Sequence, residues 1–251
     1  MVTDLDEVNL RIVRFVSRYR LGSRSTIATL LPEGTQPDKR LSTLIKKGYL
    51  KADESLPGRR PLFRLTKKGA ASTGVSVARS RLGQQALLKH LGVLYFCHVL
   101  GTHRHRVERE ELGHLFGHEL PDAAYCLCQV HDKTVVFDCY VPGPRTPVAT
   151  VVRHLRKQLK VARLTPSLAQ AVEDLRFGFA VIVHTAGRRK AIMDAVRSKQ
   201  AGEAMAFIKR VRVWVEAIDE LAVALGTALP RGRRVSAVRE ESLKARCNDL
   251  F

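Results

Sequence analysis

The sequence has no uninterrupted run of eighteen apolar residues, and its amino-terminal stretch lacks the apolar segment that a signal peptide carries. A membrane-spanning helix needs about 20 predominantly apolar residues, so none is predicted. The first residues are acidic instead, with Asp4, Asp6 and Glu7 close together, which argues against a secretory signal. We therefore expect a cytoplasmic protein without a membrane partner.

Cysteine is scarce and odd in number, with five in 251 residues. Without an export signal, this count favours reduced thiols over a disulfide framework. Cys126 and Cys128 would share one face of a strand, and several histidines precede them, but the chain has no HExxH motif. Surface or hydrogen-bonded histidines are favoured, and we expect no metal and no cofactor. The alternative is a zinc site built from the two thiols and members of the set His98, His103, His105, His114 and His118.

Acidic residues are also scarce: 24 Asp and Glu stand against 43 Lys and Arg, which gives a net charge of +19 and a pI near 10.3. The excess of cations is 8 in residues 1–75, 8 in residues 76–226 and 3 in residues 227–251. The charge is thus spread along the chain and is not confined to a tail. Such a balance argues for a polyanionic partner, and it does not by itself distinguish nucleic acid from an anionic membrane.

The chain is long enough for two domains with separate cores, since it has 251 residues of which 45% are apolar. Residues 70–80 are small and mostly polar, which is typical of a linker. We predict a first domain in residues 1–75 and a second in residues 76–226. Residues 227–251 contain Arg, Ser and Gly and are expected to form a basic, flexible tail.

Three helices are predicted near the amino terminus. Apolar residues recur at helical spacing over 5–19 and over 25–31, and a third helix is expected to end at Gly48, where a left-handed residue suits the C-terminus. We expect Thr35 to cap this third helix, with Asp38 completing a variant of the capping box. Its buried stripe would consist of Leu41, Leu44 and Ile45.

A hairpin is predicted directly after these helices. Residues 49–51 and 62–66 are short β-type runs, and the polar loop between them ends with Pro57-Gly58-Arg59-Arg60-Pro61. The order of helix, cationic helix and hairpin is typical of a winged helix-turn-helix. The phrase FRLTKKG at 63–69 resembles the close of the wing in many bacterial winged-helix proteins.

This arrangement favours double-stranded DNA over a membrane as the polyanionic partner. A helix that presents Lys and Arg can enter the major groove, and a basic wing can reach backbone phosphates. The plain alternative is a solvated basic helix beside an ordinary hairpin. The residues expected to contact DNA here are Lys39, Arg40, Thr43, Lys46, Lys47, Arg59 and Arg60.

Residues 76–226 predict an α/β sandwich, so the fold class is α/β, or α+β over the whole chain. The run 177–183 is apolar on both faces, which predicts an interior strand. The other expected elements are helices over 81–101, 109–116, 147–159, 167–175, 187–199 and from 218, a hairpin of strands 122–130 and 134–141, and an edge strand over 209–215.

Two helices of this second part carry predicted basic faces. These faces would lie beside the sheet edge and add to the binding of DNA. Their cations are Arg153, Arg156, Lys157 and Lys160 on one helix and Arg188, Arg189 and Lys190 on the other.

The hairpin followed by a helix, with Pro121-Asp122 before one strand and Asp138 in the next, resembles the core of the PD-(D/E)XK nucleases. The resemblance implies that the two acids hold a divalent ion such as Mg²⁺, while a nearby Lys activates water for phosphodiester attack. Tyr140 stands where that Lys belongs, so Lys157 or Lys160 would have to supply it. We expect no catalysis, and we expect the carboxylates to pair with neighbouring cations instead.

A winged helix, a linker helix and such a core together resemble the replication-relaxation family of plasmids and mobile elements. The resemblance is carried by Pro121-Asp122-Ala123, by Val135-Val136-Phe137-Asp138 and by the helix over 147–159, and it covers roughly residues 5–200. It implies a degenerate nuclease-like domain in a non-catalytic, sequence-preferring DNA-binding accessory protein. Its role would be replication, DNA relaxation or mobilisation.

The implied partners are double-stranded DNA, a second copy of the chain in a homodimer, and a replication or mobilisation protein. Two other functions stay open at this point. One is a metal-dependent PD-(D/E)XK endonuclease, and the other is a winged-helix repressor whose second domain serves dimerisation.

Overall fold

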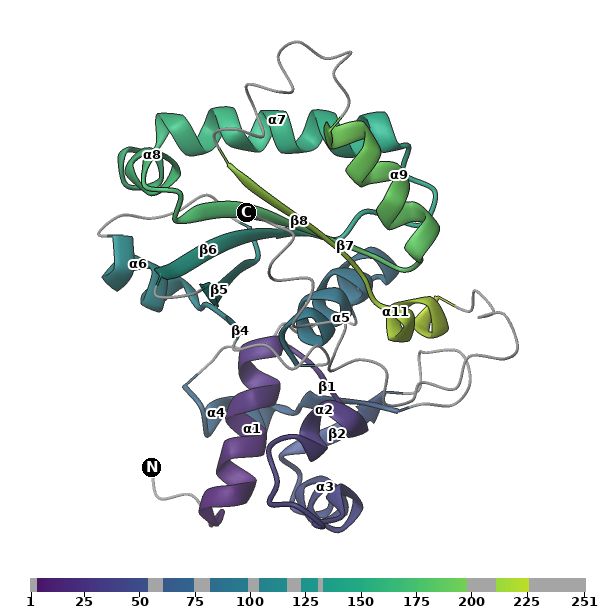
Figure 1. Cartoon of the computed structure of the whole chain (residues 1–251). Helices are drawn as coiled ribbons and strands as arrows, with labels where there is room; N and C mark the ends of the chain where they lie inside the picture. Colours follow the sequence, from purple (N-terminus) through teal and green to yellow (C-terminus); the bar gives the residue numbers. More distant parts are fainter. Residues whose placement is uncertain are drawn as a thin grey trace.

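The computed structural model of the chain describes residues 4–53, 61–74, 82–98, 104–116, 123–130, 133–197 and 211–225. Within these ranges the fold is mixed α/β, with helices arranged around two separate sheets (Figure 1). The first sheet belongs to the amino-terminal part of the chain, and the second is built from the residues that follow. The mixed class predicted from the sequence is confirmed.

The amino-terminal part combines helices with a three-stranded antiparallel sheet. Its elements are α1 (Glu7–Tyr19), β1 (Gly22–Ser23), α2 (Arg24–Ala28), α3 (Pro37–Lys46), β2 (Leu50–Asp53), β3 (Leu62–Leu65) and α4 (Lys67–Ala71). The strand order is β1-β3-β2, and Leu62 lies opposite both Ser23 and Asp53. The chain segments before and after the α2–α3 pair therefore meet in one sheet, which fixes both ends of the pair.

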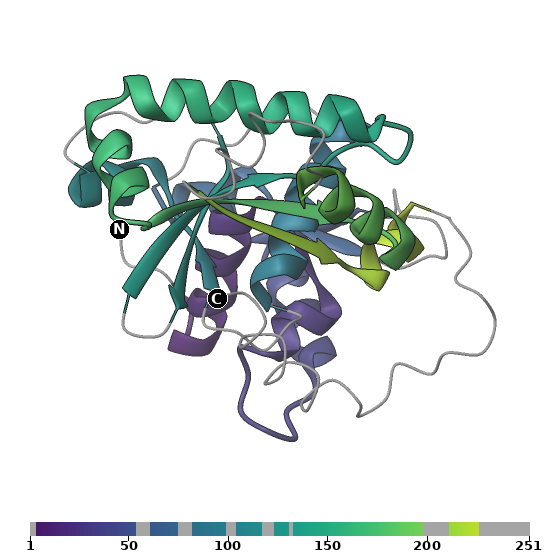
Figure 2. The same ribbon diagram turned by 45° about the horizontal axis from the view of Figure 1, so that its top comes forward.

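The second sheet has five strands and separates two layers of helices (Figure 2). Its strands are β4 (Arg104–Arg106), β5 (Tyr125–Val130), β6 (Lys133–Tyr140), β7 (Phe177–Val183) and β8 (Arg212–Ala217), in that order across the sheet. The first three strands pair antiparallel, and the last three pair parallel. All of β7 is buried and β8 lies at the edge, so the predictions of an interior strand and an edge strand are confirmed.

Helices cover both faces of this sheet. They are α5 (Gln84–His98), α6 (Arg109–Phe116), α7 (Val148–Leu164), α8 (Pro166–Glu173), α9 (Ala186–Arg197) and α11 (Asp219–Ala224). Figures 1 and 2 place α7, α8 and α9 on one face and α5 and α11 on the other. Alternate residues of a strand serve the two faces, as in β6, where Val136 packs into the core under α7 and Phe137 into the core beside α5.

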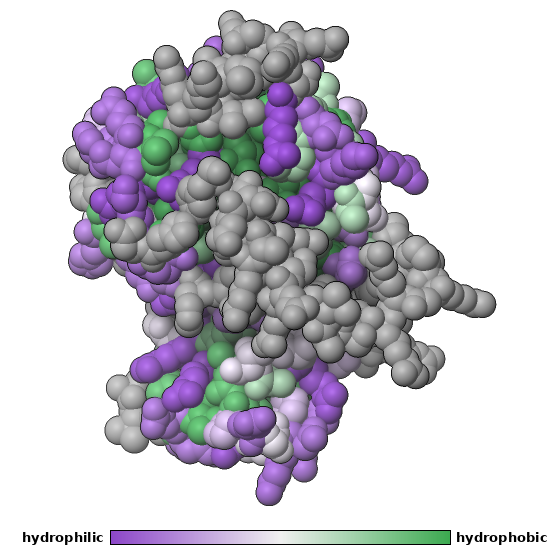
Figure 3. Space-filling model, in the orientation of Figure 1, coloured by the Kyte–Doolittle hydropathy of each residue, from purple (hydrophilic) through white to green (hydrophobic). Residues whose placement is uncertain are grey.

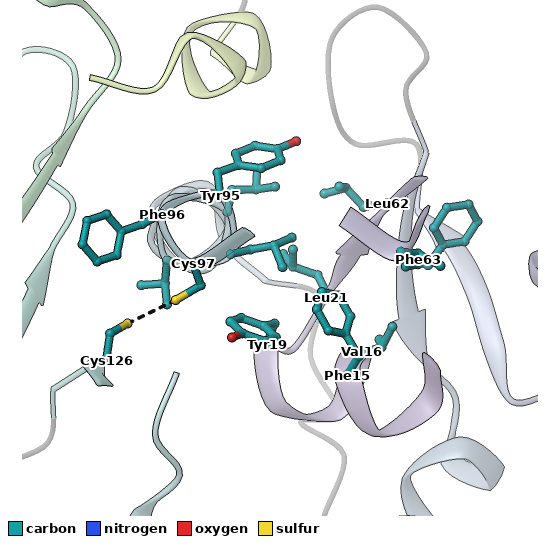
Figure 4. Close-up of a cluster of buried hydrophobic side chains, with 14 of the residues drawn as sticks. Phe15, Val16, Tyr19, Leu21, Leu62, Phe63, Tyr95, Phe96, Cys97 and Cys126 are labelled. Atoms are coloured by element: carbon teal, nitrogen blue, oxygen red, sulfur yellow. Dashed lines mark hydrogen bonds between the residues drawn. The ribbon is translucent and has the colours of Figure 1, made fainter. Parts of the chain in front are cut away.

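Helix α5 is apolar around most of its circumference and joins the two sheets. Every residue from Leu91 to Cys97 is buried. In Figure 4, Phe96 and Cys97 point toward the side of Cys126 in β5, whose Sγ lies 3.5 Å from that of Cys97, whereas Leu21 lies on the other side of the helix. One hydrophobic cluster thus runs from α1 and the first sheet through α5 into the second sheet.

The sequence does not predict β4, because Arg-His-Arg has no apolar alternation. Arg104 is nevertheless only 4% exposed. Its guanidinium carbon lies 4.1 Å from the ring centroid of Phe96 and 4.0 Å from that of Trp214, and its Nη1 donates to the Phe96 carbonyl oxygen at 3.2 Å. Aromatic faces attract a cation, so this strand depends on tertiary contacts that a local pattern does not contain.

Several boundaries differ from the prediction. The linker expected over 70–80 begins later, because residues 70 and 71 close α4, a helix that the hydroxyl of Thr66 caps by accepting from Gly69 N at 3.1 Å. The helix expected over 25–31 is the shorter α2. The tail predicted for 227–251 lies outside the described residues.

The shared core predicts that both sheets unfold together. Leu91 is fully buried in α5 between them, so Leu91→Ala should lower the free energy of unfolding by about 2–5 kcal/mol. We expect one transition in a denaturant titration, with coincident midpoints from circular dichroism and from the fluorescence of the sole tryptophan, Trp214. Leu164→Ala is the matched control, because Leu164 is 84% exposed, and it should change stability by less than about 0.5 kcal/mol. Two separate transitions would contradict a shared core.

Candidate nucleic-acid interface

Helix α3 begins differently from the prediction. Its N-cap is Gln36, which makes no side-chain capping bond, and Pro37 occupies the first turn, where its missing N–H costs nothing. The expected cap at Thr35 is therefore wrong. Asp38 is engaged elsewhere, since it accepts two hydrogen bonds from Arg24 of α2, at 2.7 Å from Nε and 2.6 Å from Nη2. This pair ties α2 to α3 and holds the pKa of Asp38 below its usual range.

The outward face of α3 carries cations and hydroxyls. Leu41 and Leu44 are buried as predicted, but Ile45 is 38% exposed and does not belong to the buried stripe. Gly48 ends this segment with φ of +75°, which confirms the predicted left-handed position. The exposed side chains on the face opposite Leu41 and Leu44 are Lys39, Ser42 and Lys46, with the half-buried Thr43 beside them.

Ser42 is the member of this face that the sequence interpretation missed. It lies three residues after Lys39 and four before Lys46, so helical spacing alone could have placed it between them. Thr43, its neighbour, donates from Oγ1 to the carbonyl oxygen of Lys39 at 2.9 Å. That bond uses the proton of Thr43 within the helix.

Two of the predicted DNA-binding cations are paired with the acidic amino-terminal segment. Arg40 Nη1 lies 2.5 Å from Asp6 Oδ2. Lys47 Nζ donates to the Asp4 carbonyl oxygen at 2.9 Å and lies 3.5 Å from Oδ2 of the same aspartate. Hydrogen bonds from the Tyr49 hydroxyl and the Asn9 backbone amide lower the pKa of Asp4 and Asp6 respectively, and the nearby cations lower both further. Arg40 and Lys47 therefore lie on the flank of α3, where they connect it to the start of α1.

The hairpin that follows α3 is present as predicted, with β2 and β3 paired from Leu50↔Leu65 to Asp53↔Leu62. Near the loop end of the paired strands Arg64 Nη1 lies 3.1 Å from Asp53 Oδ2, and both side chains are largely buried. The two arginines predicted at its tip, Arg59 and Arg60, lie outside the described residues.

A second basic surface lies on α7. The helix buries Val151, Leu155, Leu159 and Ala162, and its sequence contains no Asp or Glu. On its outer side Arg153, Lys157 and Lys160 are exposed and Arg156 is half-buried, as the sequence predicted. Arg163, which the prediction did not include, extends this exposed row by one turn.

The two α9 arginines that were predicted to bind DNA form hydrogen bonds to main-chain carbonyl oxygens of neighbouring elements. Arg188 Nη2 donates to the carbonyl oxygens of Gly143 and Thr146, in the turn that leads into α7, with 3.4 Å to the former. Arg189 Nε donates to the Val215 carbonyl oxygen in β8 at 2.9 Å. Both side chains are half-buried, in contrast to the exposed Lys190 beside them. These bonds assign the two arginines to positioning β8 and the α7 turn.

Of the two acids of the nuclease-like pattern, the structure describes only Asp138. Asp138 is 6% exposed in β6, and burial raises its pKa to about 6, with only a small opposing effect of Lys89. No ion pair of Asp138 occurs among the described residues, so the expected pairing with cations is wrong for this acid. Asp122 lies outside the described residues.

The lysine that a nuclease of this type would need does not lie on the side of α7 that faces the sheet. Lys157 and Lys160 are exposed on α7, whereas the side of that helix facing the sheet is formed by Leu155 and Leu159. Tyr140, at the position of the missing Lys, stacks on His154 of α7 with ring centroids 4.0 Å apart. The exposed positions of Lys157 and Lys160 do not favour the alternative in which one of them supplies the missing lysine.

The cysteines and histidines do not gather into a metal-binding group in the part of the chain that the structure describes. Cys126 and Cys128 are buried in the core. The ring of His98 packs at 4.8 Å against those of Phe15 and Tyr19, and burial lowers its pKa to about 4. His114 is exposed, while His103 and His118 lie outside the described residues.

Asp138 should make stability depend on pH in an identifiable direction. Its pKa is about 6 in the folded chain, against about 3.9 for an unfolded Asp. The folded state binds this proton more tightly than the unfolded state does. The contribution of Asp138 to the free energy of unfolding is therefore full below pH 4 and is lost as the pH rises through 6. We expect the fall in unfolding free energy from pH 4 to pH 7 to be larger in the unchanged protein than in Asp138→Asn, by on the order of 3 kcal/mol. Glu173→Gln, at an exposed acid, should leave the profile unchanged. Identical profiles for Asp138→Asn and the unchanged protein would contradict the burial of an acid here.

No helix in the described ranges combines the length and the apolar character needed to cross a membrane. No protein-family model matches the sequence, no curated protein matches it, and no solved structure matches the fold. The nuclease-like and replication-relaxation resemblances gain no support from these comparisons. The function is therefore argued from the residues and geometry described above.

Proposed function

We propose that the chain is a double-stranded DNA-binding accessory protein without catalytic activity of its own. Its amino-terminal part would act as a winged helix-turn-helix, with α3 as the helix that enters the major groove. The observation that carries this proposal is the outward face of α3, where Lys39, Ser42 and Lys46 are exposed together and Thr43 lies beside them.

The surroundings of α3 support this assignment. A groove-binding helix has to be held rigidly at its back and sides, and α3 packs Leu41 and Leu44 into the core while the Asp38–Arg24 pair fixes one flank. The opposite flank is fixed by the pairs of Arg40 and Lys47 with acidic residues. The contact set we propose is therefore narrower than the sequence suggested. It consists of Lys39 and Lys46 for phosphates and Ser42 and Thr43 for base edges.

The biological setting rests on the resemblance alone. A role in replication, DNA relaxation or mobilisation of a plasmid or mobile element, with a replication or mobilisation protein as partner, is the setting in which such an accessory protein would act. The second part of the chain would then be a degenerate nuclease-like domain. The burial of Asp138 and the outward position of Lys157 favour a non-catalytic role over the endonuclease alternative.

Lys39→Ala combined with Lys46→Ala should weaken binding to every duplex. Two phosphate contacts would be lost, so the slope of log affinity against log salt should decrease by about 2 between roughly 50 and 200 mM salt. Fluorescence anisotropy of a labelled duplex measures both quantities. Lys133→Ala combined with Arg176→Ala is the matched control. Lys133 is the first residue of β6, Arg176 directly precedes β7, and both are exposed and outside α3. This double variant should keep the affinity within about threefold. Equal losses in the two double variants would point to nonspecific charge and would contradict a role for α3.

The protein should not cleave DNA. With magnesium or manganese present, we expect supercoiled, linear and single-stranded substrates to stay intact on gels, because a buried Asp138 and an outward Lys157 do not form a metal and water site. Asp138→Ala serves as the comparison. Metal-dependent nicking that disappears in this variant would instead assign the protein to the nucleases.

A further inference from the structure

The basic surface on α7 differs in kind from that on α3. We define the α7 face as Arg153, Arg156, Lys157, Lys160 and Arg163, which follow one side of a helix of 17 residues, about 25 Å long at 1.5 Å per residue. None of these five cations forms an ion pair with a carboxylate among the described residues, and α7 itself contains no acid. By contrast, Arg40 on α3 and its C-cap residue Lys47 are already paired with Asp6 and Asp4. Within the described ranges, the charge of the α7 face is therefore available to an external polyanion.

The two basic surfaces lie at opposite ends of the molecule. α3 lies at the lower end in Figure 1, and α7 lies across the upper end, on the face of the five-stranded sheet turned away from α5. Figure 2 agrees with this placement. In Figure 3, hydrophilic side chains are seen at both sides of the upper part and around the lower end. Because the continuous core with α5 lies between them, a straight duplex seated on α3 would not also contact the outer side of α7.

From this separation we infer that the chain bridges two DNA duplexes, one held by α3 and the other by the α7 face. The inference rests on the proposed function, because α3 has to hold the first duplex. The α7 face offers only Arg and Lys along its exposed row, so it binds phosphates and reads no bases. The second duplex is therefore taken up without regard to its sequence and is released by salt.

A capture experiment tests this bridging. One duplex is fixed to beads, the protein is added, and the retention of a second, fluorescent duplex is measured at about 50 mM salt. The unchanged protein should retain the second duplex. Lys157→Glu combined with Lys160→Glu alters two exposed residues, so folding should be preserved. This variant should bind the fixed duplex within about threefold of the unchanged protein and retain the second at least tenfold less.

A control variant changes charge elsewhere, and two different results would overturn the bridging inference. Lys133→Glu combined with Arg176→Glu makes the same change in net charge at exposed residues that belong to neither surface, and should retain the second duplex normally. Wild-type retention by the Lys157/Lys160 variant would overturn the bridging inference, and it would indicate a dimer that uses two α3 helices. No retention by the unchanged protein, despite tight binding of the fixed duplex, would also overturn it. If Lys39→Glu and Lys46→Glu, added to the variant that already carries Lys157→Glu and Lys160→Glu, left binding of the fixed duplex intact, the proposed function itself would fail.

Discussion

The burial of α5 on both sides is the constraint on which the rest of the structure depends. A helix that is apolar around most of its circumference has to be covered by more than one layer, and here α1 and the first sheet cover one side while the second sheet covers the other. Because Leu91 to Cys97 are all buried, the two sheets share one core. Neither half of the chain can present its surface independently of the other, and the two basic surfaces keep fixed positions relative to each other.

The placement of charge follows from this core. The acids that lie near α3 are used in ion pairs that orient it, such as Asp6 with Arg40, so that its remaining cations point to solvent. On α7 no acid is present, and Lys157 and Lys160 lie outward because Leu155 and Leu159 are needed against the sheet. The same amphipathic pattern that packs each helix therefore decides which cations face solvent, where the proposed DNA contacts would form.

Most elements could be predicted from the sequence, because periodicity fixes the type of an isolated helix or strand. The apolar run that forms β7 and the stripe that buries α7 both follow from local pattern alone. What local pattern could not give were the partners chosen in three dimensions. Asp38 could have completed a capping box, yet it pairs with Arg24 across the α2–α3 turn. Arg104 is held between the rings of Phe96 and Trp214, and the second of these is distant in sequence. The burial of Asp138 likewise depends on the layers on either side of its sheet.

The central claim is that the outward face of α3 is where a duplex sits. Footprinting by reductive methylation of lysine tests it most directly, since each lysine reports its own exposure by mass spectrometry with and without DNA. We predict that duplex DNA protects Lys39 and Lys46 and leaves Lys133, exposed at the start of β6, as reactive as in the free protein. Unchanged reactivity of Lys39 and Lys46 in a sample saturated with duplex would contradict the account.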